Sequence, residues 1–493
     1  MYRLVLYYLI GLIGIALAFS LLGLLPYNWL GLLFSVVFLL AVAWTTNWIF
    51  AKTFSVVANV ESVYISALIL GLIINPAKSV VDLPFLFWAA VLTMASKFVV
   101  TVYNKHIFNP VALAVFLTSL GIYHSASWWV GSRVMVLPVL IGGVLIVRKI
   151  KHGTMVSSFF IASFAVVLFF SLKNGFSPIA SIEKLSLNSP WLFFGFVMLT
   201  EPLTIPPTNN LRLLYGLLVG FLFAPQMHFG SIYSTPETAL LIGNLYSYLV
   251  SFKRRLILTL EKKVQVAPDI YDFIFKAESK LNFRPGQYLE WTLGHQNADS
   301  RGNRRYFTIA SSPTEDEIRI GVKFYSQSST YKQSLLSLKP GDKIVASQLA
   351  GDFVLNKDKM QKMVFIAGGI GITPFGSILK FLIDTNQSRP ITLFYAVRSP
   401  QDVVYSDILS TAVKLLGIRV VYLLTSATEP VLEWSGKIGR ITTEMLAEEV
   451  PDYQQRIFYL SGPPSMVDAY KKTLLKMGIR RTKIKTDYFP GFA

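Results

Sequence analysis

Long apolar runs without charged residues constrain the first half of the chain more than any other feature. The hydrocarbon core of a membrane is about 30 Å thick and takes roughly 20 apolar residues in a helix. Residues 1–252 hold run after run of this kind and carry only 12 Lys and Arg with 5 Asp and Glu. A soluble core does not present so many uncharged runs, so we predict a polytopic α-helical membrane bundle.

Ten segments have suitable composition, and we predict about ten membrane helices. They lie at about 4–25, 29–50, 61–75, 83–102, 107–122, 128–147, 154–172, 188–201, 211–226 and 236–252. The third and eighth segments are short and bounded by proline, and they hold matching positions in two halves of five. An odd number of helices in each half inverts the second half, so this match favours a 5+5 inverted repeat.

The basic residues predict an orientation, because Lys and Arg accumulate in cytoplasmic loops. With a cytoplasmic N-terminus, ten such residues fall in inner loops and four in outer loops. We therefore expect a multi-pass protein of the plasma (cytoplasmic) membrane, with lipid as a partner. An even number of spans places the N-terminus and the C-terminal half in the cytoplasm.

The chain has no cysteine, which excludes disulfides, thiolate-held zinc and iron–sulfur clusters ligated by this chain. The four histidines of the first half fall mainly at predicted helix ends or in loops, on both sides of the membrane. Ferric reductases of membranes hold two haems through pairs of His on facing helices, and no predicted helix here offers such a pair. We therefore expect no metal site, and a ferric-reductase-like electron-transfer protein is kept as an alternative.

Acidic residues inside a membrane domain are rare and are candidates for function. Glu61 opens the third predicted span and Glu237 opens the tenth, where the helix dipole favours a carboxylate. Glu201 closes the eighth span, at the end that the dipole disfavours, and is the strongest of the three candidates.

Two stretches of the first half resemble a known membrane-subunit family. One is KHIFNP (Lys105 to Pro110) after a segment E-x-x-x-x-x-A-L-I-L-G-L from Glu61, and the other is MLTEPLTIPPT (Met198 to Thr208). They resemble the B subunit of sodium-translocating NADH:quinone reductase and the D subunit of Rnf-type complexes. The resemblance implies inverted repeats and a bound flavin.

The S-G-A-T-type motif that carries covalent FMN in that family is absent from the outer loop LKNGFSPIASIEKLSLNS. The implied second flavin, FMN or riboflavin, would therefore be held without a covalent bond. Its candidate residues are Glu61, Lys105, His106, Asn109, Glu201 and Thr204.

The second half has the composition of a soluble protein, with 34 basic and 23 acidic residues. Short alternating strands separated by turn residues predict an antiparallel β-barrel in residues 253–357. From residue 358 strands alternate with helices, which predicts an α/β domain with a parallel sheet in residues 358–493.

Three motifs carry chemistry in this half. Arg305-Tyr306-Phe307-Thr308 ends a strand with an Arg for a pyrophosphate, an aromatic ring for stacking and a hydroxyl for a flavin nitrogen. Ala367 to Pro374 forms a glycine turn from strand to helix, where backbone N–H groups can reach a pyrophosphate. Ser461-Gly462-Pro463-Pro464 follows a later strand, and the tail aromatic Phe489 is a candidate cover for a flavin face.

In this order the motifs resemble the ferredoxin–NADP reductase superfamily. The resemblance implies FAD in the barrel, bound by Arg305, Phe307 and Thr308 with Tyr306 at the variable position. It implies a second phosphate contact from Ser328, Ser329 and Thr330. It implies NAD(P)H as substrate at Gly368, Gly369, Gly371, Thr373, Pro374, Gly462, Pro463 and Pro464. Ser461 stands where the family usually has Cys, and we expect Thr308, Ser461 and Phe489 at the reacting rings.

The preference for NADH or NADPH depends on residues after the strand LFYAV. Arg398 could hold a 2′-phosphate, whereas Asp402 would repel one. Thr425-Ser426 lacks a following Arg, and the balance favours NADH.

The two halves together predict a membrane-bound flavoprotein oxidoreductase. We expect hydride transfer from NAD(P)H to FAD in the cytoplasm and electron transfer to a quinone, a second flavin or a redox partner protein. The alternative is a transporter or ion-translocating protein with a regulatory reductase domain. Nucleic acid is not an expected partner, because the aromatic residues belong to the span and strand patterns.

Overall fold

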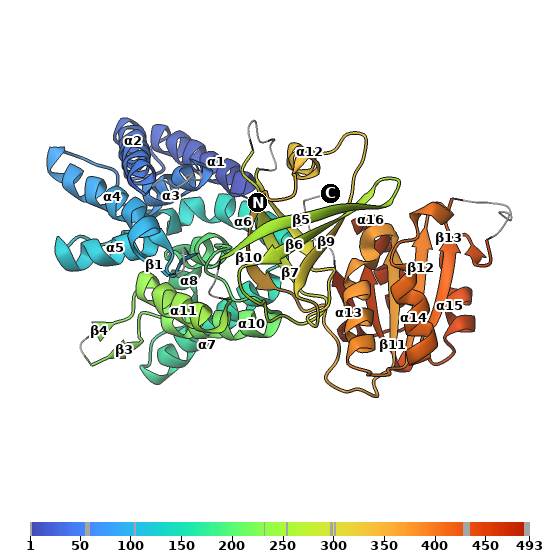
Figure 1. Ribbon diagram of the computed structural model, residues 1–493. Coiled ribbons are helices and arrows are strands. Elements are labelled where there is room, and N and C mark those ends of the chain that lie inside the picture. The colour runs from blue at the N-terminus through green and yellow to red at the C-terminus, as the bar shows by residue number, and fades with distance from the viewer. Residues whose placement is uncertain are drawn as a thin grey trace. The chain divides into compact units, whose positions relative to one another are not determined.

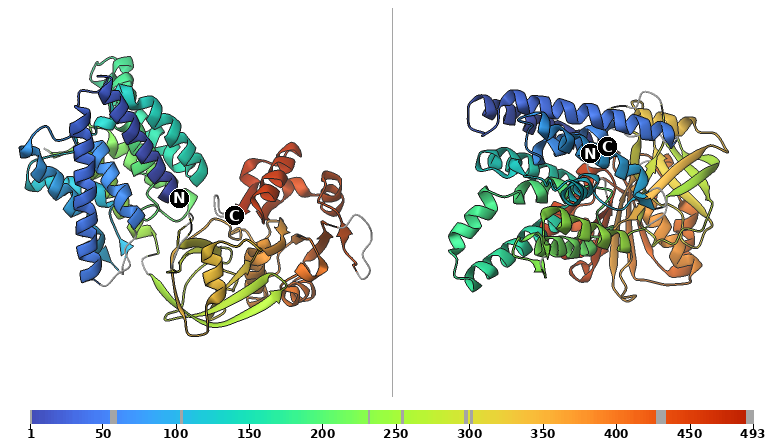
Figure 2. Two further views of the ribbon diagram at one scale, coloured as in Figure 1. Left: turned by 90° about the horizontal axis from the view of Figure 1, so that it is seen from above. Right: turned by 90° about the vertical axis from the view of Figure 1, so that its left-hand side faces the viewer.

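The computed structural model describes residues 2–54, 60–102, 105–230, 232–252, 255–295, 299, 302–426 and 434–487. The chain divides into two compact units, Met1–Arg254 and Arg255–Ala493. The first is helical and the second contains the large sheets (Figures 1 and 2). Each unit is considered by itself.

The N-terminal unit consists of helices with short connections. Its helices are α1 (Tyr2–Leu21), α2 (Trp29–Thr53), α3 (Val60–Ile73), α4 (Leu83–Val99), α5 (Pro110–Gly121), α6 (Val136–Ile150), α7 (Gly153–Lys173), α8 (Pro178–Leu187), α9 (Trp191–Phe193), α10 (Asn209–Phe223) and α11 (Pro236–Val250). Four helical segments are long and apolar enough to cross a membrane, namely Arg3–Leu21, Trp29–Thr53, Val80–Val99 and Gly153–Lys173. The described part thus contains fewer helices of spanning length than the predicted ten.

Two regions of the unit differ from the sequence-based expectation. The predicted outer loop contains α8, which begins at Pro178 and is capped by the hydroxyl of Ser177. The predicted eighth span is α9 followed by a π-helix, η4 (Phe194–Met198). Because the helical path stops at Leu199, this segment leaves Glu201 in the irregular stretch before α10.

One arrangement of elements occurs in both halves of the unit. Between α4 and α5 lies a hairpin of β1 (Thr101–Val102) and β2 (Lys105–His106), and between α10 and α11 lies a hairpin of β3 (His228–Phe229) and β4 (Ile232–Tyr233). The next helix is then capped by Asn109 before Pro110 in one half and by Thr235 before Pro236 in the other. A polar cap before proline is a favoured helix start.

The second unit begins with a six-stranded antiparallel sheet of order β8-β7-β10-β5-β6-β9. Its strands are β5 (Leu256–Ala267), β6 (Ile270–Ala277), β7 (Tyr288–Thr292), β8 (Arg304–Thr308), β9 (Glu317–Lys323) and β10 (Lys343–Ala350), with helix α12 (Thr330–Ser337) before β10. Buried and partly exposed residues alternate along β9, as expected of a strand with one face on the core.

A parallel sheet follows, of order β14-β13-β12-β11-β15-β16. Its strands are β11 (Met363–Gly368), β12 (Ile391–Val397), β13 (Arg419–Leu424), β14 (Lys437–Ile438), β15 (Ile457–Ser461) and β16 (Ile484–Asp487). Helices α13 (Thr373–Asp384) and α14 (Ser406–Leu416) pack on one face, and α15 (Thr443–Glu449) and α16 (Pro464–Lys476) on the other. Because helices cover both faces, every residue of β11 and β12 is buried.

The strand order changes direction between β11 and β15, which are neighbours in the sheet. In open α/β sheets, ligands bind beyond the carboxyl ends of the strands at this point. The two glycine motifs of the sequence follow these two strands.

Candidate active site

Three strand ends lie side by side at the carboxyl edge of the parallel sheet. Ala367 of β11 pairs with Ser461 of β15, and Ser461 pairs with Asp487 of β16. Ser461 is fully enclosed, with 2% of its surface exposed. The register therefore brings three features together. They are the glycine turn after β11, Ser461 in the position where the family usually has Cys, and Asp487 at the end of β16.

The glycine turn after β11 is shaped for close approach. Gly369 has φ +52, and a Cβ added there would meet nothing within 4 Å, so its outer side is open to a ligand. A Cβ on Gly371 would lie 2.4 Å from the carbonyl oxygen of Ser461, so only glycine fits. Thr373 then begins α13 with Pro374 in its first turn, and the Thr373 N–H is bonded to the Ile370 carbonyl of η5 (Gly369–Ile372), the 3-10 turn that leads into the helix.

The second glycine motif closes the other side of this turn. A Cβ on Gly462 would lie 2.6 Å from the methyl group of Met466 and 3.2 Å from the Cα of Gly368. Pro463 precedes α16, and Pro464 is its first residue. The two motifs thus lie against each other at the switch point, and their role in binding a dinucleotide stays a prediction.

Strand β8 reaches this edge from the antiparallel sheet. The buried hydroxyl of Thr308 donates a hydrogen bond to Oδ2 of Asp487 across 3.0 Å. Desolvation raises the pKa of Asp487 to about 7, and the hydrogen bond from Thr308 opposes part of that rise. The predicted flavin contact is therefore joined to a carboxyl group that changes its protonation near neutral pH.

Arg305 is buried at the start of the same motif, with 5% of its surface exposed. Its guanidinium donates to the carbonyl oxygens of Gly302 and Arg304 across 3.0 and 2.7 Å and lies 4.9 Å from the ring centre of Tyr331. Its remaining edge is 3.7 Å from a carboxylate oxygen of Asp299.

The start of α12 shares that carboxylate. The backbone N–H of Thr330 donates to Oδ2 of Asp299 across 3.2 Å, and the Asp299 N–H donates to the Thr330 hydroxyl across 3.0 Å. Ser329 caps the helix, whereas Ser328 donates to the Tyr325 carbonyl. Arg305 and the helix N-terminus thus bind one anionic group together, which is the donor set that a diphosphate requires.

The other two residues of the motif face different neighbours. The Tyr306 hydroxyl donates to Oε2 of the buried Glu290 across 2.9 Å, and the Phe307 ring centre lies 6.2 Å from that of Tyr331. The sequence did not indicate Glu290 or Tyr331, because nothing in their local patterns sets them apart from strand and helix core residues. Phe489 lies outside the described residues.

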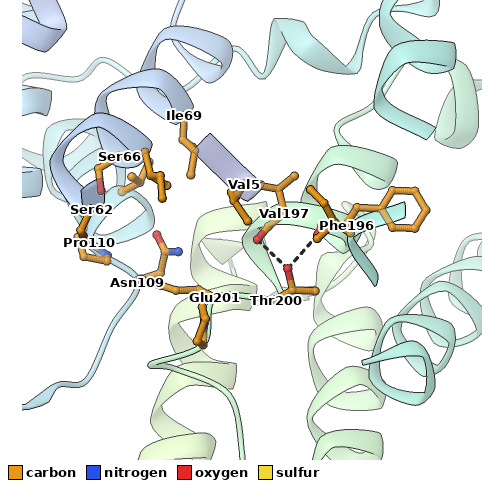
Figure 3. A pocket seen from close by; sticks show the side chains of 14 residues that line it. Val5, Ser62, Ser66, Ile69, Asn109, Pro110, Phe196, Val197, Thr200 and Glu201 are labelled. Atoms are coloured by element: carbon orange, nitrogen blue, oxygen red, sulfur yellow. Dashed lines mark hydrogen bonds between the residues drawn. The ribbon is translucent and has the colours of Figure 1, made fainter. Parts of the chain in front are cut away.

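A second candidate site is a cavity of about 50 Å³ within the N-terminal unit. Figure 3 shows Ser62, Ser66, Asn109 and Glu201 on one side of this space and Phe196 with apolar neighbours on the other. The walls therefore combine one polar side with an apolar side.

Glu201 is at the centre of a polar network beside this cavity. Asn109 and Thr204 hydrogen-bond to its carboxylate, and Nε2 of His106 is 3.9 Å from it. Lys97 interacts with Glu201 electrostatically. The structure thus brings together four predicted candidates, which come from the two resembling stretches.

The other candidates of this unit lie apart. Glu61 pairs with Arg3 across 2.6 Å and does not line the cavity. Lys105 belongs to β2, and its side chain lies outside the described part. Lys97 escaped the sequence analysis, and its ammonium donates to the carbonyl and hydroxyl of Ser62 and to the hydroxyl of Ser66, each across 2.9 Å. A lone charge within an apolar span was the signal that could have revealed it.

Comparison with known proteins identifies the second half. The profile of the oxidoreductase NAD-binding domain matches residues 365–472. NADH-cytochrome b5 reductase 1 of Aspergillus oryzae is 30% identical over 223 residues, which are 43% of this chain and 75% of that protein. The C-terminal half of the chain belongs to the ferredoxin reductase-type family. It is an NAD(P)H-dependent, FAD-containing reductase.

Other relatives match the same half of the chain. The reductase subunit of glycine betaine monooxygenase from Chromohalobacter salexigens is 27% identical over 221 residues, and a flavohemoprotein from Bacillus cereus is 28% identical over 239 residues. They cover 44% and 46% of this chain, which spans 59% of the length of each. Among solved structures, the FAD/NAD-binding domain of nitric oxide dioxygenase from Vibrio cholerae is 21% identical, with a TM-score of 0.42, and covers 47% of this chain and 97% of its own.

The donor sets of this reductase fit its two nucleotides. FAD held by Arg305 and the start of α12 would supply the chemistry of taking up a hydride with a proton and releasing electrons singly. The Thr308 hydroxyl and the Asp487 carboxyl would then hold a proton at the flavin edge. Ser461 would line the place where the nicotinamide meets the flavin.

The residue that the sequence linked to nucleotide preference is bound in an ion pair. Nζ of Lys323, on β9, lies 3.3 Å from Oδ1 of Asp402, and both side chains are mostly buried. Asp402 follows β12, at the carboxyl edge of the reductase's parallel sheet. The Asp402 carboxylate is therefore held in place by a residue of the antiparallel sheet.

Proposed function

We propose that the whole chain is a membrane-bound flavoprotein oxidoreductase. Its reductase half takes a hydride from NADH in the cytoplasm, and its N-terminal unit receives the electrons in the membrane. The observation that carries the proposal is the meeting of Thr308, Ser461 and Asp487 beside the glycine turn. The nicotinamide of NADH, the flavin and the Asp487 carboxyl would then meet at one edge of the parallel sheet.

The residues at the carboxyl edge of the parallel sheet have separate roles in binding the nucleotide and in supplying a proton. The turns at Gly369 and Gly462 admit the nucleotide backbone, and the N-terminus of α13 stabilises its phosphates. A protonated Asp487 would donate to the Thr308 hydroxyl, and the Thr308 proton would then be available to an FAD bound beside it. Because burial raises the pKa of Asp487 to about 7, this carboxyl can hold a proton near neutral pH.

NADH is the proposed donor. Asp402 lies beyond β12 and repels a 2′-phosphate, although its pairing with Lys323 reduces that repulsion. Arg398, which follows β12, favours NADPH, so the preference is one of degree.

Membrane insertion of the N-terminal unit is supported by its four long apolar helices. The recurrence of helix, hairpin and capped helix in both halves supports the proposed inverted repeat of five and five. Together with the distribution of Lys and Arg, it favours a cytoplasmic reductase.

The proposed electron acceptor binds at the cavity beside Glu201. Ser62, Ser66 and Asn109 offer hydrogen bonds on one side, and apolar residues line the other. This combination suits an aromatic ring with carbonyl oxygens, such as a quinone head group or a second flavin (FMN or riboflavin).

The repeat also supports the second candidate function, in which the N-terminal unit transports a solute or ion and the reductase regulates it. Arg305→Ala separates the two. Loss of electron transfer from NADH to a quinone in this variant supports the oxidoreductase. The transporter is supported by two results together. Solute uptake is unchanged in Arg305→Ala, and the natural chain reduces no quinone.

The most informative experiment on the purified chain is cofactor extraction with mass spectrometry. FAD alone, with NADH-dependent reduction of a soluble quinone, supports direct transfer to the quinone. FAD with FMN or riboflavin supports a relay of two flavins. Haem in the extract would favour the ferric-reductase-like alternative instead.

A further inference from the structure

Two buried side chains, Asp272 and Tyr405, and the partly exposed Arg319 join the two sheets of the reductase away from the strand ends. The Tyr405 hydroxyl donates to Oδ1 of Asp272 across 2.8 Å, and a guanidinium nitrogen of Arg319 lies 3.9 Å from Oδ2 of the same carboxylate. Asp272 belongs to β6 and Arg319 to β9, whereas Tyr405 caps α14 of the nucleotide-binding half. We call Asp272, Arg319 and Tyr405 the bridging cluster.

The backbone of Tyr405 is held in an unfavourable conformation. Its φ is +58, in the left-handed region that is unfavourable for a residue with a side chain. Such conformations persist where surrounding contacts determine them, and they concentrate at functional positions. The hydrogen bond to Asp272 and the packing of the Tyr405 ring against Gly376 of α13 supply those contacts here.

A glycine on β9 makes room for this junction. A Cβ on Gly321 would lie 2.8 Å from the methyl group of Thr373, 2.8 Å from the Tyr405 hydroxyl and 3.1 Å from Oδ1 of Asp272. Thr373 is the first residue of α13, the helix that follows the glycine turn proposed to bind the dinucleotide. The antiparallel sheet is therefore in contact with the element that positions the hydride donor.

A second tie holds the same helix. The Ser377 hydroxyl, one turn further along α13, donates to the carbonyl oxygen of Ser311 across 2.6 Å, and Ser311 follows β8. The helix is thus fixed to the antiparallel sheet at its first residue by contact and one turn later by a hydrogen bond.

We propose that Asp272, Arg319 and Tyr405 are positioning residues for hydride transfer. They hold the N-terminus of α13, and with it the bound dinucleotide, at a fixed distance from the flavin on the antiparallel sheet. The proposal rests on the reductase activity of this half and assigns these residues no contact with either ring. Hydride transfer depends steeply on the separation of donor and acceptor, so a small shift between the sheets slows it strongly.

The charges around Asp272 give the bridging cluster a pH dependence. Burial raises the pKa of Asp272 to about 6, while Tyr405 and Arg319 lower it and Asp407 of α14 raises it. Glu315, which lies 3.7 Å from Arg319, competes for the guanidinium. Below about pH 6 the protonated carboxyl attracts Arg319 less, so the junction loosens on acidification.

The test uses Tyr405→Phe and Asp272→Asn in the full chain, since each removes one interaction and keeps the side-chain size. Tyr470→Phe is the matched control, because the Tyr470 hydroxyl accepts from the Ile441 N–H across 3.3 Å on the other face of the same sheet. Anaerobic stopped-flow absorbance at the flavin band gives the rate of flavin reduction and the Kd for NADH. Extracted FAD gives the cofactor content.

We expect both variants to keep their FAD and to bind NADH within about threefold of the natural chain, but to reduce flavin about tenfold more slowly. The rate in Tyr470→Phe stays within about twofold. The natural chain slows below about pH 6, and Asp272→Asn loses this step. An unchanged rate in Tyr405→Phe, an equal loss in Tyr470→Phe, loss of FAD from either variant, or an acid step that persists in Asp272→Asn would each overturn the proposal.

Discussion

Thr308 and Asp487 are 179 residues apart in sequence, and a hydrogen bond of 3.0 Å joins the hydroxyl of the first to the carboxylate of the second. The bond links the strand that would hold the flavin to the last described strand of the nucleotide-binding sheet. Since desolvation raises the pKa of Asp487 to about 7, the pair connects proton supply to hydride transfer at physiological pH.

Asp487→Asn tests that connection. The amide can keep a contact with Thr308 but cannot deliver a proton, so we expect turnover with NADH to fall about a hundredfold. In the natural chain turnover falls as the pH rises through about 7, because Asp487 loses its proton there. The variant should lack this alkaline step in a pH profile. Asp452→Asn, which changes a carboxylate paired with Lys362 on the same domain, is the control and should keep it.

Arg305→Ala tests the diphosphate site. Removing a buried charge-assisted contact costs about 2–3 kcal/mol, which is roughly a hundredfold in FAD affinity. We expect the purified variant to lose its flavin absorbance while its circular dichroism stays native. Arg304→Ala removes the neighbouring guanidinium, which pairs with Glu290 instead, and should retain FAD. Full flavin content in Arg305→Ala would contradict the assignment.

Gly371→Ala tests the glycine turn. The added Cβ would lie 2.4 Å from the Ser461 carbonyl oxygen, so the turn and the β15 end must separate. We expect KM for NADH to rise at least about fivefold with FAD retained, since overpacking of this kind costs about 1–3 kcal/mol. Gly417→Ala is the control, because it makes the same substitution where an added Cβ would meet nothing within 4 Å. Since Gly417 has φ +67, this variant should have a lower Tm but an unchanged KM for NADH. Equal KM values in the two variants would count against the nucleotide site.

Asp402 and Lys323 predict opposite changes in nucleotide preference. Asp402→Asn removes the charge that repels a 2′-phosphate, so the ratio of kcat/KM for NADH to that for NADPH should fall about tenfold. Lys323→Met leaves the Asp402 carboxylate uncompensated, so the same ratio should rise. Steady-state kinetics with both nucleotides measure it. A shift of both variants in one direction would show that the pair acts through structure and not through charge.

Local patterns in the sequence predicted much of the fold. Alternating and continuous apolar runs indicated strands such as β5 and β11. The sequence predicted helices over 373–385 and 464–477, and the structure has α13 at Thr373–Asp384 and α16 at Pro464–Lys476. The strand β16 was missed because its four residues are all partly exposed and owe their conformation to pairing with β15. The helix α8 was missed because only its cap, Ser177, and Pro178 mark it.

Some residues of the candidate site could likewise be predicted from local sequence patterns, and others could not. Glycine turns and Arg305 carry local signals, because their backbone conformation or charge is needed wherever such a site occurs. The partnership of Asp272 with Tyr405 has no such signal, since it depends on the absence of a side chain at Gly321 on a third element. The ammonium of Lys97 likewise meets Ser62 and Ser66 only when α3 and α4 are packed.

The central claim is that this chain passes electrons from NADH through FAD, and anaerobic titration of the purified full chain with NADH tests it most directly. We expect one equivalent of NADH to bleach the flavin absorbance of one FAD per chain, and a soluble quinone to restore it. A flavin spectrum that NADH leaves unchanged, or a chain that holds no FAD after reconstitution, would contradict the account.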